Sequence, residues 1–106
     1  MVARVQVPAS ARRGDEIEVR IAIQHPMETG FRFDMGGRAI PKNVVNHVVC
    51  RFEGEIVFEA EMGSGIAANP YLQFTAVAQR SGTFTFEWVD DRGVGESQSA
   101  AITVTP

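Results

Sequence analysis

Apolar and polar residues alternate strictly in one stretch near the start of the chain. Between residues 16 and 24, Ile17, Val19, Ile21 and Ile23 alternate with polar or small residues. Successive side chains of a β-strand point to opposite faces, so a period of two predicts a strand with one buried face and one solvated face.

Similar patterns recur along the chain, and turn residues such as Glu53-Gly54 and Ser81-Gly82 separate them. They predict further strands over residues 2–7, 44–52, 55–62, 71–78, 83–89 and 99–105. The predicted inward residues of the last four are Ile56, Phe58, Ala60 and Met62; Leu72, Phe74, Ala76 and Ala78; Phe84, Phe86 and Trp88; and Ala100, Ile102 and Val104.

No stretch has helical periodicity for more than about one turn. About seven such strands in a chain of 106 residues predict an all-β fold. Its expected form is a single domain over residues 1–106, an immunoglobulin-like antiparallel β-sandwich.

Charge excludes one broad class of partner. The formal net charge is -3, and no run of basic residues exceeds the pair Arg12-Arg13. Proteins that bind nucleic acids normally carry a basic stripe, so we expect no nucleic-acid partner. No apolar run approaches the ~20 residues that cross a bilayer, and residues 1–10 lack a signal-peptide pattern. We therefore expect no membrane partner.

The sequence offers little for catalysis. Cys50 is the only cysteine, so no disulfide can form within the chain. On a strand, Val48, Cys50 and Phe52 share one face while His47 lies on the other, which predicts a buried Cys50 without a neighbouring base. Asp90 and Asp91 fall where a turn is expected, and turns favour aspartate for backbone reasons. We expect no catalytic residue, no metal and no cofactor.

Two other functions remain open at this point. One cysteine, two histidines and four methionines are the ligand types of a blue-copper electron-transfer sandwich. In such proteins the ligands gather on one loop near the C-terminus, whereas here both histidines precede Cys50. The second alternative is a free-standing immunoglobulin-like interaction module.

The connection from residue 25 to residue 43 departs from the alternating pattern. His25 continues the inward phase of the preceding strand, and Pro26 ends that strand because it cannot donate a hydrogen bond. The connection also carries many large apolar residues, namely Met27, Phe31, Phe33, Met35 and Ile40. They either cap the core of the sandwich or form an adaptable contact surface for another protein.

Several segments together resemble the SoxZ family of the bacterial sulfur-oxidation (Sox) system. They are "HPMETGFRFDMGGRAIPKNVVN", "FEGE", "ANPYLQF" and "SGTFTFEWVDDRG". The resemblance implies an immunoglobulin-like subunit that pairs with SoxY, whose cysteine on a Gly-rich C-terminal arm carries the intermediates of thiosulfate oxidation. It also implies a periplasmic location through export together with SoxY, and indirect contact with other Sox enzymes. This chain ends in a strand without cysteine, so we expect it to be the non-carrier subunit.

We expect partner contacts on two segments, the long connection and the loop before residue 72. The candidate residues are His25, Met27, Glu28, Phe31, Arg32, Asn69, Pro70 and Tyr71. Met27 and Phe31 would be apolar anchors, and Glu28 and Arg32 would set the orientation. An isolated chain with such a surface could also associate with itself.

Overall fold

The computed structural model describes residues 2–63 and 68–106. Within them it has eight strands: β1 (Ala3–Gln6), β2 (Ser10–Arg12), β3 (Glu16–Ile23), β4 (Val45–Phe52), β5 (Glu55–Glu61), β6 (Tyr71–Val77), β7 (Gly82–Asp90) and β8 (Gly95–Thr105). Seven of them lie where the alternating pattern predicts a strand. The eighth, β2, has only three residues, too few for a period to be recognised.

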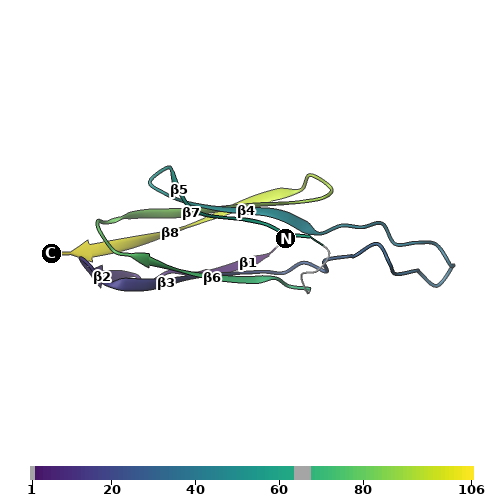
Figure 1. The fold of residues 1–106 in the computed structure, drawn as a ribbon, viewed down its shortest axis with the longest axis horizontal. Helices are drawn as coiled ribbons and strands as arrows, with labels where there is room; N and C mark the ends of the chain where they lie inside the picture. Colours follow the sequence, from purple (N-terminus) through teal and green to yellow (C-terminus); the bar gives the residue numbers. More distant parts are fainter. Residues whose placement is uncertain (1, 64–67) are drawn as a thin grey trace.

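The strands form two facing sheets, as Figure 1 shows. One sheet has the order β1-β3-β6, and the other has the order β2-β8-β7-β4-β5. All pairings are antiparallel except that of β2 with β8, which is parallel. The prediction of an immunoglobulin-like β-sandwich is therefore confirmed.

The core lies between the sheets, where the predicted inward faces meet. Val19 and Ile21 of β3 face Cys50 of β4 and Phe86 of β7, and all four side chains are almost completely buried. Away from this centre, the gap is closed by an aromatic pair. Phe58 of β5 stacks on Phe74 of β6 with ring centroids 4.6 Å apart.

One predicted face is wrong at the start of β5. The pairing of β4 with β5 changes register, so that Phe58 lies opposite Cys50 whereas Ile56 lies opposite Arg51. An extra residue in a strand moves the residues beyond it to the other face. Ile56 therefore points away from the core, with 52% of its surface exposed.

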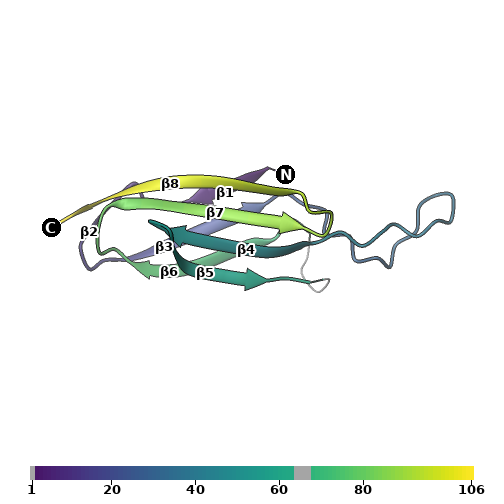
Figure 2. The same ribbon diagram turned by 90° about the horizontal axis from the view of Figure 1, so that it is seen from above.

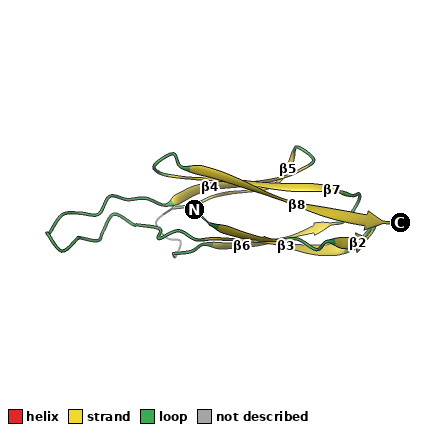
Figure 3. Cartoon of the chain, turned by 180° about the vertical axis from the view of Figure 1, so that it is seen from behind, coloured by secondary structure: helices red, strands yellow, loops and turns green. Residues whose placement is uncertain are grey.

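Residues 27–43, which we call the arm, leave the sandwich as two legs that run side by side (Figures 1 and 2). Glu28 and Asn43 exchange backbone hydrogen bonds of 2.8 and 2.9 Å near its base, and Phe33 bridges Ala39 further out. At the tip, the carboxylate of Asp34 accepts the N–H groups of Gly36 and Arg38, both at 2.9 Å. Figure 3 shows the arm from behind, as a long loop beyond the end of both sheets. The molecule measures 61 × 19 × 19 Å, so the arm extends the domain and does not cover its core.

Candidate partner-binding site

The arm carries large apolar side chains in solvent. Phe31 is 82% exposed, Phe33 is 68% exposed and Met35 is fully exposed. Single exposed apolar residues are common, but three at alternate positions of one projecting segment mark a contact surface for another molecule. The structure thus favours the contact-surface interpretation of this connection over the core-capping one.

A buried polar cluster holds the base of the arm. His25, two residues after the end of β3, has 3% of its surface exposed. Its Nδ1 accepts the backbone N–H of Met27 at 2.9 Å, and its Nε2 lies 3.4 Å from Oδ2 of Asp90. Because Nδ1 is an acceptor, a neutral His25 carries its proton on Nε2, and this N–H donates a hydrogen bond to Asp90.

Asp90, the last residue of β7, is the centre of this cluster. Its Oδ2 also accepts the side-chain amide of Asn43 at 3.3 Å, from the returning leg of the arm. Its Oδ1 accepts the N–H groups of Arg92 and Val94, each at 3.0 Å. One carboxylate therefore joins the outgoing leg, the returning leg and the turn between β7 and β8.

The hydrogen bonds also decide the charge of Asp90. Burial raises the pKa of its carboxyl group, whereas the hydrogen bonds from Val94, Asn43, His25 and Arg92 lower it. The hydrogen bonds outweigh burial, so the pKa of Asp90 lies below its ordinary value and the group is a carboxylate at neutral pH.

The loop before β6 is tied to the same base. The side chain of Asn69 accepts the N–H of His25 at 3.0 Å, and the N–H of Asn69 donates to the carbonyl oxygen of His25 at 2.8 Å. Asn69 has a φ of 54°, a left-handed conformation that asparagine tolerates better than most residues. The two segments predicted to contact a partner are therefore neighbours in space.

The eight predicted residues divide into exposed and buried ones. Phe31, Arg32, Asn69 and Tyr71 are exposed, and Glu28 is mostly buried, with Oε1 accepting a hydrogen bond of 3.0 Å from Arg32. His25, Met27 and Pro70 are buried in this chain.

The expected role of Met27 as an exposed anchor is wrong for this conformation. With a φ of 52°, its backbone turns the side chain inward, where the sulfur accepts the N–H of Val45 at 3.2 Å. Met27 and His25 therefore shape the base of the arm. Partner contact by the exposed residues stays a prediction.

Sequence reasoning missed several residues of this region. The apolar residues Phe33 and Met35 are not among the predicted contact residues, although both are largely exposed on the arm. Asn43 and Asp90 were also missed, because Asp90 reads as an ordinary turn residue. The available signal was weak, since "DDRG" follows a strand whose inward phase, Phe84, Phe86 and Trp88, continues to residue 90.

The remaining reactive residue types do not assemble into a site. Cys50 is fully buried, and burial raises the pKa of its thiol to about 12. His47 lies on the other face of β4 and pairs with Glu59 at 3.0 Å. Within residues 2–63 and 68–106, no group of three or more His, Cys, Asp or Glu side chains is placed to hold a metal ion.

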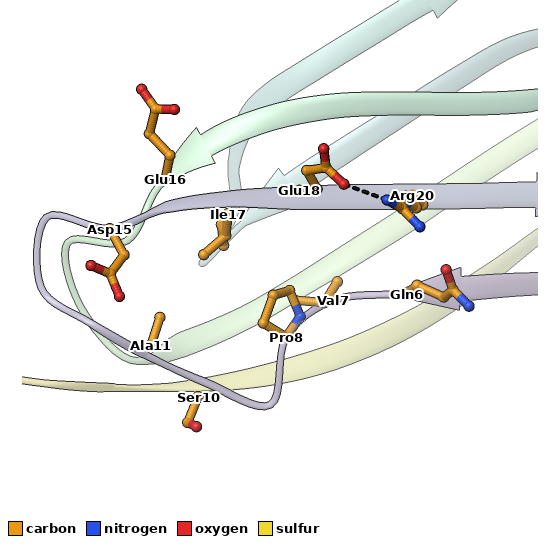
Figure 4. Close-up of a pocket in the computed structure, with 10 residues that line it drawn as sticks. All are labelled: Gln6, Val7, Pro8, Ser10, Ala11, Asp15, Glu16, Ile17, Glu18 and Arg20. Atoms are coloured by element: carbon orange, nitrogen blue, oxygen red, sulfur yellow. Dashed lines mark hydrogen bonds and ion pairs between the residues drawn. The ribbon is translucent and has the colours of Figure 1, made fainter.

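A hollow of about 620 Å³ lies at the other end of the molecule, beside the crossover from β1 to β3 (Figure 4). Ser10 and Asp15 are at its rim, and Glu18 pairs with Arg20 along its wall. The carboxylate of Asp15 accepts the N–H of Arg12 at 3.0 Å, which is an ordinary turn interaction. The lining includes no histidine that could activate Ser10, so we assign no chemistry to this hollow.

Solved structures share this fold at low sequence identity. A superoxide reductase (neelaredoxin) from Ignicoccus hospitalis is 15% identical, with a TM-score of 0.77 over 98% of this chain and 80% of that chain. The sulfur carrier protein SoxY from Chlorobium limicola f thiosulfatophilum is 11% identical, with a TM-score of 0.67 over 98% and 79%. A neelaredoxin from Archaeoglobus fulgidus is 19% identical, with a TM-score of 0.67 over 96% and 87%. At such identities the likeness shows the fold alone.

The sequence itself gives a more specific relationship. No curated protein matches it. The described part of the chain contains no helix that is long and apolar enough to cross a bilayer. The model of the family described as sulphur oxidation protein SoxZ matches residues 4–101, which is nearly the whole chain. The chain therefore belongs to the SoxZ family.

Proposed function

We propose that this chain is the SoxY-binding subunit of a SoxYZ carrier complex in periplasmic thiosulfate oxidation. In this role it positions the C-terminal segment of SoxY that carries the reactive cysteine, and it forms no covalent intermediate itself. Membership of the SoxZ family implies a role in the Sox sulfur-oxidation system and a partnership with SoxY. The family is generally non-catalytic and periplasmic.

The observation that carries the proposal is the apolar surface of the arm. Phe31, Phe33 and Met35 are exposed to water on the arm. The arm projects beyond the end of both sheets (Figure 2). Burying one such side chain contributes about 1.5–3 kcal/mol, so a partner that covers all three gains several kcal/mol before the costs of association. A stable two-subunit complex needs an apolar surface of this kind.

The state of the only cysteine supports a non-covalent role. A carrier thiol must reach the active sites of other enzymes and must ionise readily to form a bond. Cys50 does neither, because it is fully buried in the middle of β4 and its pKa is raised to about 12. The covalent step is therefore assigned to the partner.

The second predicted segment extends the same surface. Asn69 is exposed and hydrogen-bonds to His25 at the base of the arm, and Tyr71 is 55% exposed two residues further on. A partner that covers the arm can therefore reach Asn69 and Tyr71, which flank the buried Pro70, without a separate contact elsewhere. On the arm itself, Glu28 holds Arg32 at 3.0 Å and orients its guanidinium group.

The test is the affinity of this chain for the SoxY protein of the same organism. Replacing Phe31 by aspartate removes an exposed apolar anchor and places a charge in the interface. We expect the Kd to rise by roughly 30-fold or more, which corresponds to about 2 kcal/mol, while the thermal unfolding of the isolated chain is unchanged.

Two matched variants complete the experiment. Phe31→Leu keeps an apolar side chain and should bind almost as well as the parent. Ser99→Asp adds the same charge on β8 and should have no effect on affinity. If Phe31→Asp binds as tightly as the parent, the arm is not the docking element. If Phe31→Asp unfolds the isolated chain, Phe31 belongs to the folded core and the arm is not the docking element either.

A further inference from the structure

The two sheets have four edge strands, and three of them are protected against pairing with another chain. β1 has four residues and β2 has three, which is too short for stable strand addition. β2 covers only Thr103–Thr105 of β8, and the part of β8 that it leaves open carries the charged residue Glu96. β5 is interrupted by a register shift and carries Glu55, Glu59 and Glu61. Charged residues and irregularities are the common means by which proteins protect an edge.

The edge of β6 has neither form of protection. Its seven residues, "YLQFTAV", include no charged residue and no proline. They pair with β3 without a register shift, from Glu16 opposite Val77 to Ala22 opposite Tyr71. β6 is the last strand of its sheet, so its other side is open. A regular, uncharged edge of this length is suited to accept another strand.

The register identifies the backbone groups that are available. At one end, Ile23 donates its N–H to the carbonyl oxygen of Pro70 at 2.9 Å, and at the other, Ala78 donates to Asp15 at 2.8 Å. Hydrogen-bonded pairs alternate along an antiparallel ladder, so the even-numbered residues of β6 bond to β3. The odd-numbered ones direct their N–H and C=O groups to the open side, and these are Tyr71, Gln73, Thr75 and Val77.

The neighbouring strand of the other sheet indicates which side chains a partner strand needs. β5 lies across the gap from β6, as the stacked pair Phe58–Phe74 requires, and Figure 2 shows the two strands along the same side of the sandwich. Glu59 is paired with His47, whereas Glu55 and Glu61 have no ion-pair partner in the part of the chain that the structure describes. Glu61 shares the outward face of β5 with Glu59, whereas Glu55 lies opposite Phe52 and borders the space beside β6. A strand added beside β6 would run past Glu55, and a basic side chain would complement this carboxylate.

The same side of the sandwich also contains a cavity of about 270 Å³. Val57 of β5, Ala76 of β6 and Phe84 of β7 give part of its lining an apolar character, and Glu55 and Arg80 line the rest together with Gln79. A volume of this size accommodates one apolar side chain pointing inward from a neighbouring strand. The edge, the charges and the cavity therefore specify one kind of occupant.

We propose that the free edge of β6 binds an extended strand of the partner subunit and thereby adds a fourth strand to the sheet β1-β3-β6. The inward side chains of that strand include an apolar residue for the cavity and a Lys or Arg residue for Glu55. Tyr71 begins β6 directly after the loop at the base of the arm, so one partner can engage the arm and this edge together. The identity of the partner as SoxY rests on the proposed function, whereas the mode of binding goes beyond it.

A second copy of this chain is a less suitable occupant. Pairing two β6 edges would bring two β5 strands together, each with Glu55 and Glu61, in chains with a net charge of -3. Like charges at an interface oppose association.

Residue-resolved amide exchange of the chain, alone and in complex with SoxY, tests the proposal directly. In the free chain, the amides of Leu72, Phe74 and Ala76 should exchange slowly, whereas those of Gln73, Thr75 and Val77 should exchange at least ten times faster. In the complex, the second group should slow by more than tenfold. If the complex forms and these amides exchange as they do in the free chain, the edge is not used. If they are already slow in the free chain, and more so at higher protein concentration, the edge pairs with a second copy.

A backbone variant provides an independent measurement. Thr75→Pro removes an N–H that points to the open side, and proline is tolerated on an edge strand at such positions. We expect it to raise the Kd for SoxY by about tenfold or more, while Thr75→Val, which keeps the N–H, binds like the parent. Unchanged binding by Thr75→Pro would overturn the proposal. If that variant does not fold, the exchange experiment on the parent chain decides alone.

The arm variant distinguishes the two proposals. If Phe31→Asp abolishes binding but the β6 amides gain no protection in the parent complex, the proposed function stands and the strand addition fails. If the chain does not bind SoxY at all, the proposed function fails, and with it the identity of the strand donor.

Discussion

Asp90→Asn is the most informative single change, because it alters charge without altering size. The asparagine oxygen can still accept the N–H groups of Arg92 and Val94. Its NH₂ group, however, replaces the oxygen that accepts hydrogen bonds from Asn43 at 3.3 Å and His25 at 3.4 Å. The donor groups of His25 and Asn43 then face the NH₂ group at position 90, which is itself a donor, in a buried cluster.

The size of the effect follows from these contacts. Each hydrogen bond to a charged acceptor contributes about 1.5–3 kcal/mol, and the two lost ones are long, so the lower value applies. Adding a modest penalty for the donors left unpaired gives a loss of about 3–4 kcal/mol in the free energy of unfolding. For a domain of this size, that lowers Tm by about 15 °C. Asp15→Asn, which alters an exposed turn carboxylate, is the matched control and should change Tm far less.

The pH dependence gives a second readout with a definite sign. The pKa of Asp90 is lower in the folded chain than the ordinary value of about 3.9 for aspartate. Its contribution is therefore complete above that ordinary value and is lost as the pH falls toward the native pKa. Chemical unfolding of the parent and of Asp90→Asn should differ by a constant amount above about pH 5 and by less below about pH 4. A difference under 1 kcal/mol at neutral pH, or one that does not shrink in acid, would show that Asp90 does not stabilise the arm base through its charge.

Two further predictions concern the core. Cys50 should not react with a thiol reagent at about pH 8 in the native protein, because the thiol is fully buried and its pKa is raised to about 12. One thiol should react once the chain is unfolded. Rapid labelling of the native chain would contradict the burial. Gly82→Ala should lower the free energy of unfolding by about 1–3 kcal/mol, since an added Cβ would lie 2.5 Å from Cζ of Phe52 and 2.6 Å from Oε1 of Glu53. Gly63→Ala should be neutral, because apart from the chain neighbours no atom of the described residues lies within 4 Å of the added Cβ. Equal effects of the two variants in denaturant titrations would contradict this reasoning.

The strands were predictable because their burial is periodic over a long enough range. β3 and β7 each keep one phase over eight or nine residues, and their inward residues form the centre of the core. The phase of β5 was not predictable at Ile56. The register shift there depends on how β5 pairs with β4, which no pattern within residues 55–62 expresses.

The arm was only partly predictable, because its conformation depends on contacts between residues that are distant in sequence. The apolar content of residues 27–43 indicated a special connection, and Pro26 indicated where β3 ends. The pairing of Glu28 with Asn43 and the contact of His25 with Asp90, 65 positions away, decide that the arm projects. Met27 shows the limit clearly, because neither its left-handed backbone nor the contact of its sulfur with the N–H of Val45 is expressed in the residues around it.

The arrangement separates the stability of the arm from its affinity for a partner. Phe31, Phe33 and Met35 lie beyond the base and take no part in the Asp90 cluster, so changes at the tip should alter binding without altering unfolding. Changes at the base should alter both, because a loosened arm must be ordered again when the partner binds. Sites without shared contacts act additively. In a double variant, the binding loss from Phe31→Asp should therefore add to that from Asp90→Asn if the base acts only by positioning the arm. A combined loss smaller than the sum would mean that the two sites are coupled, so that the contacts of the tip with the partner depend on the base.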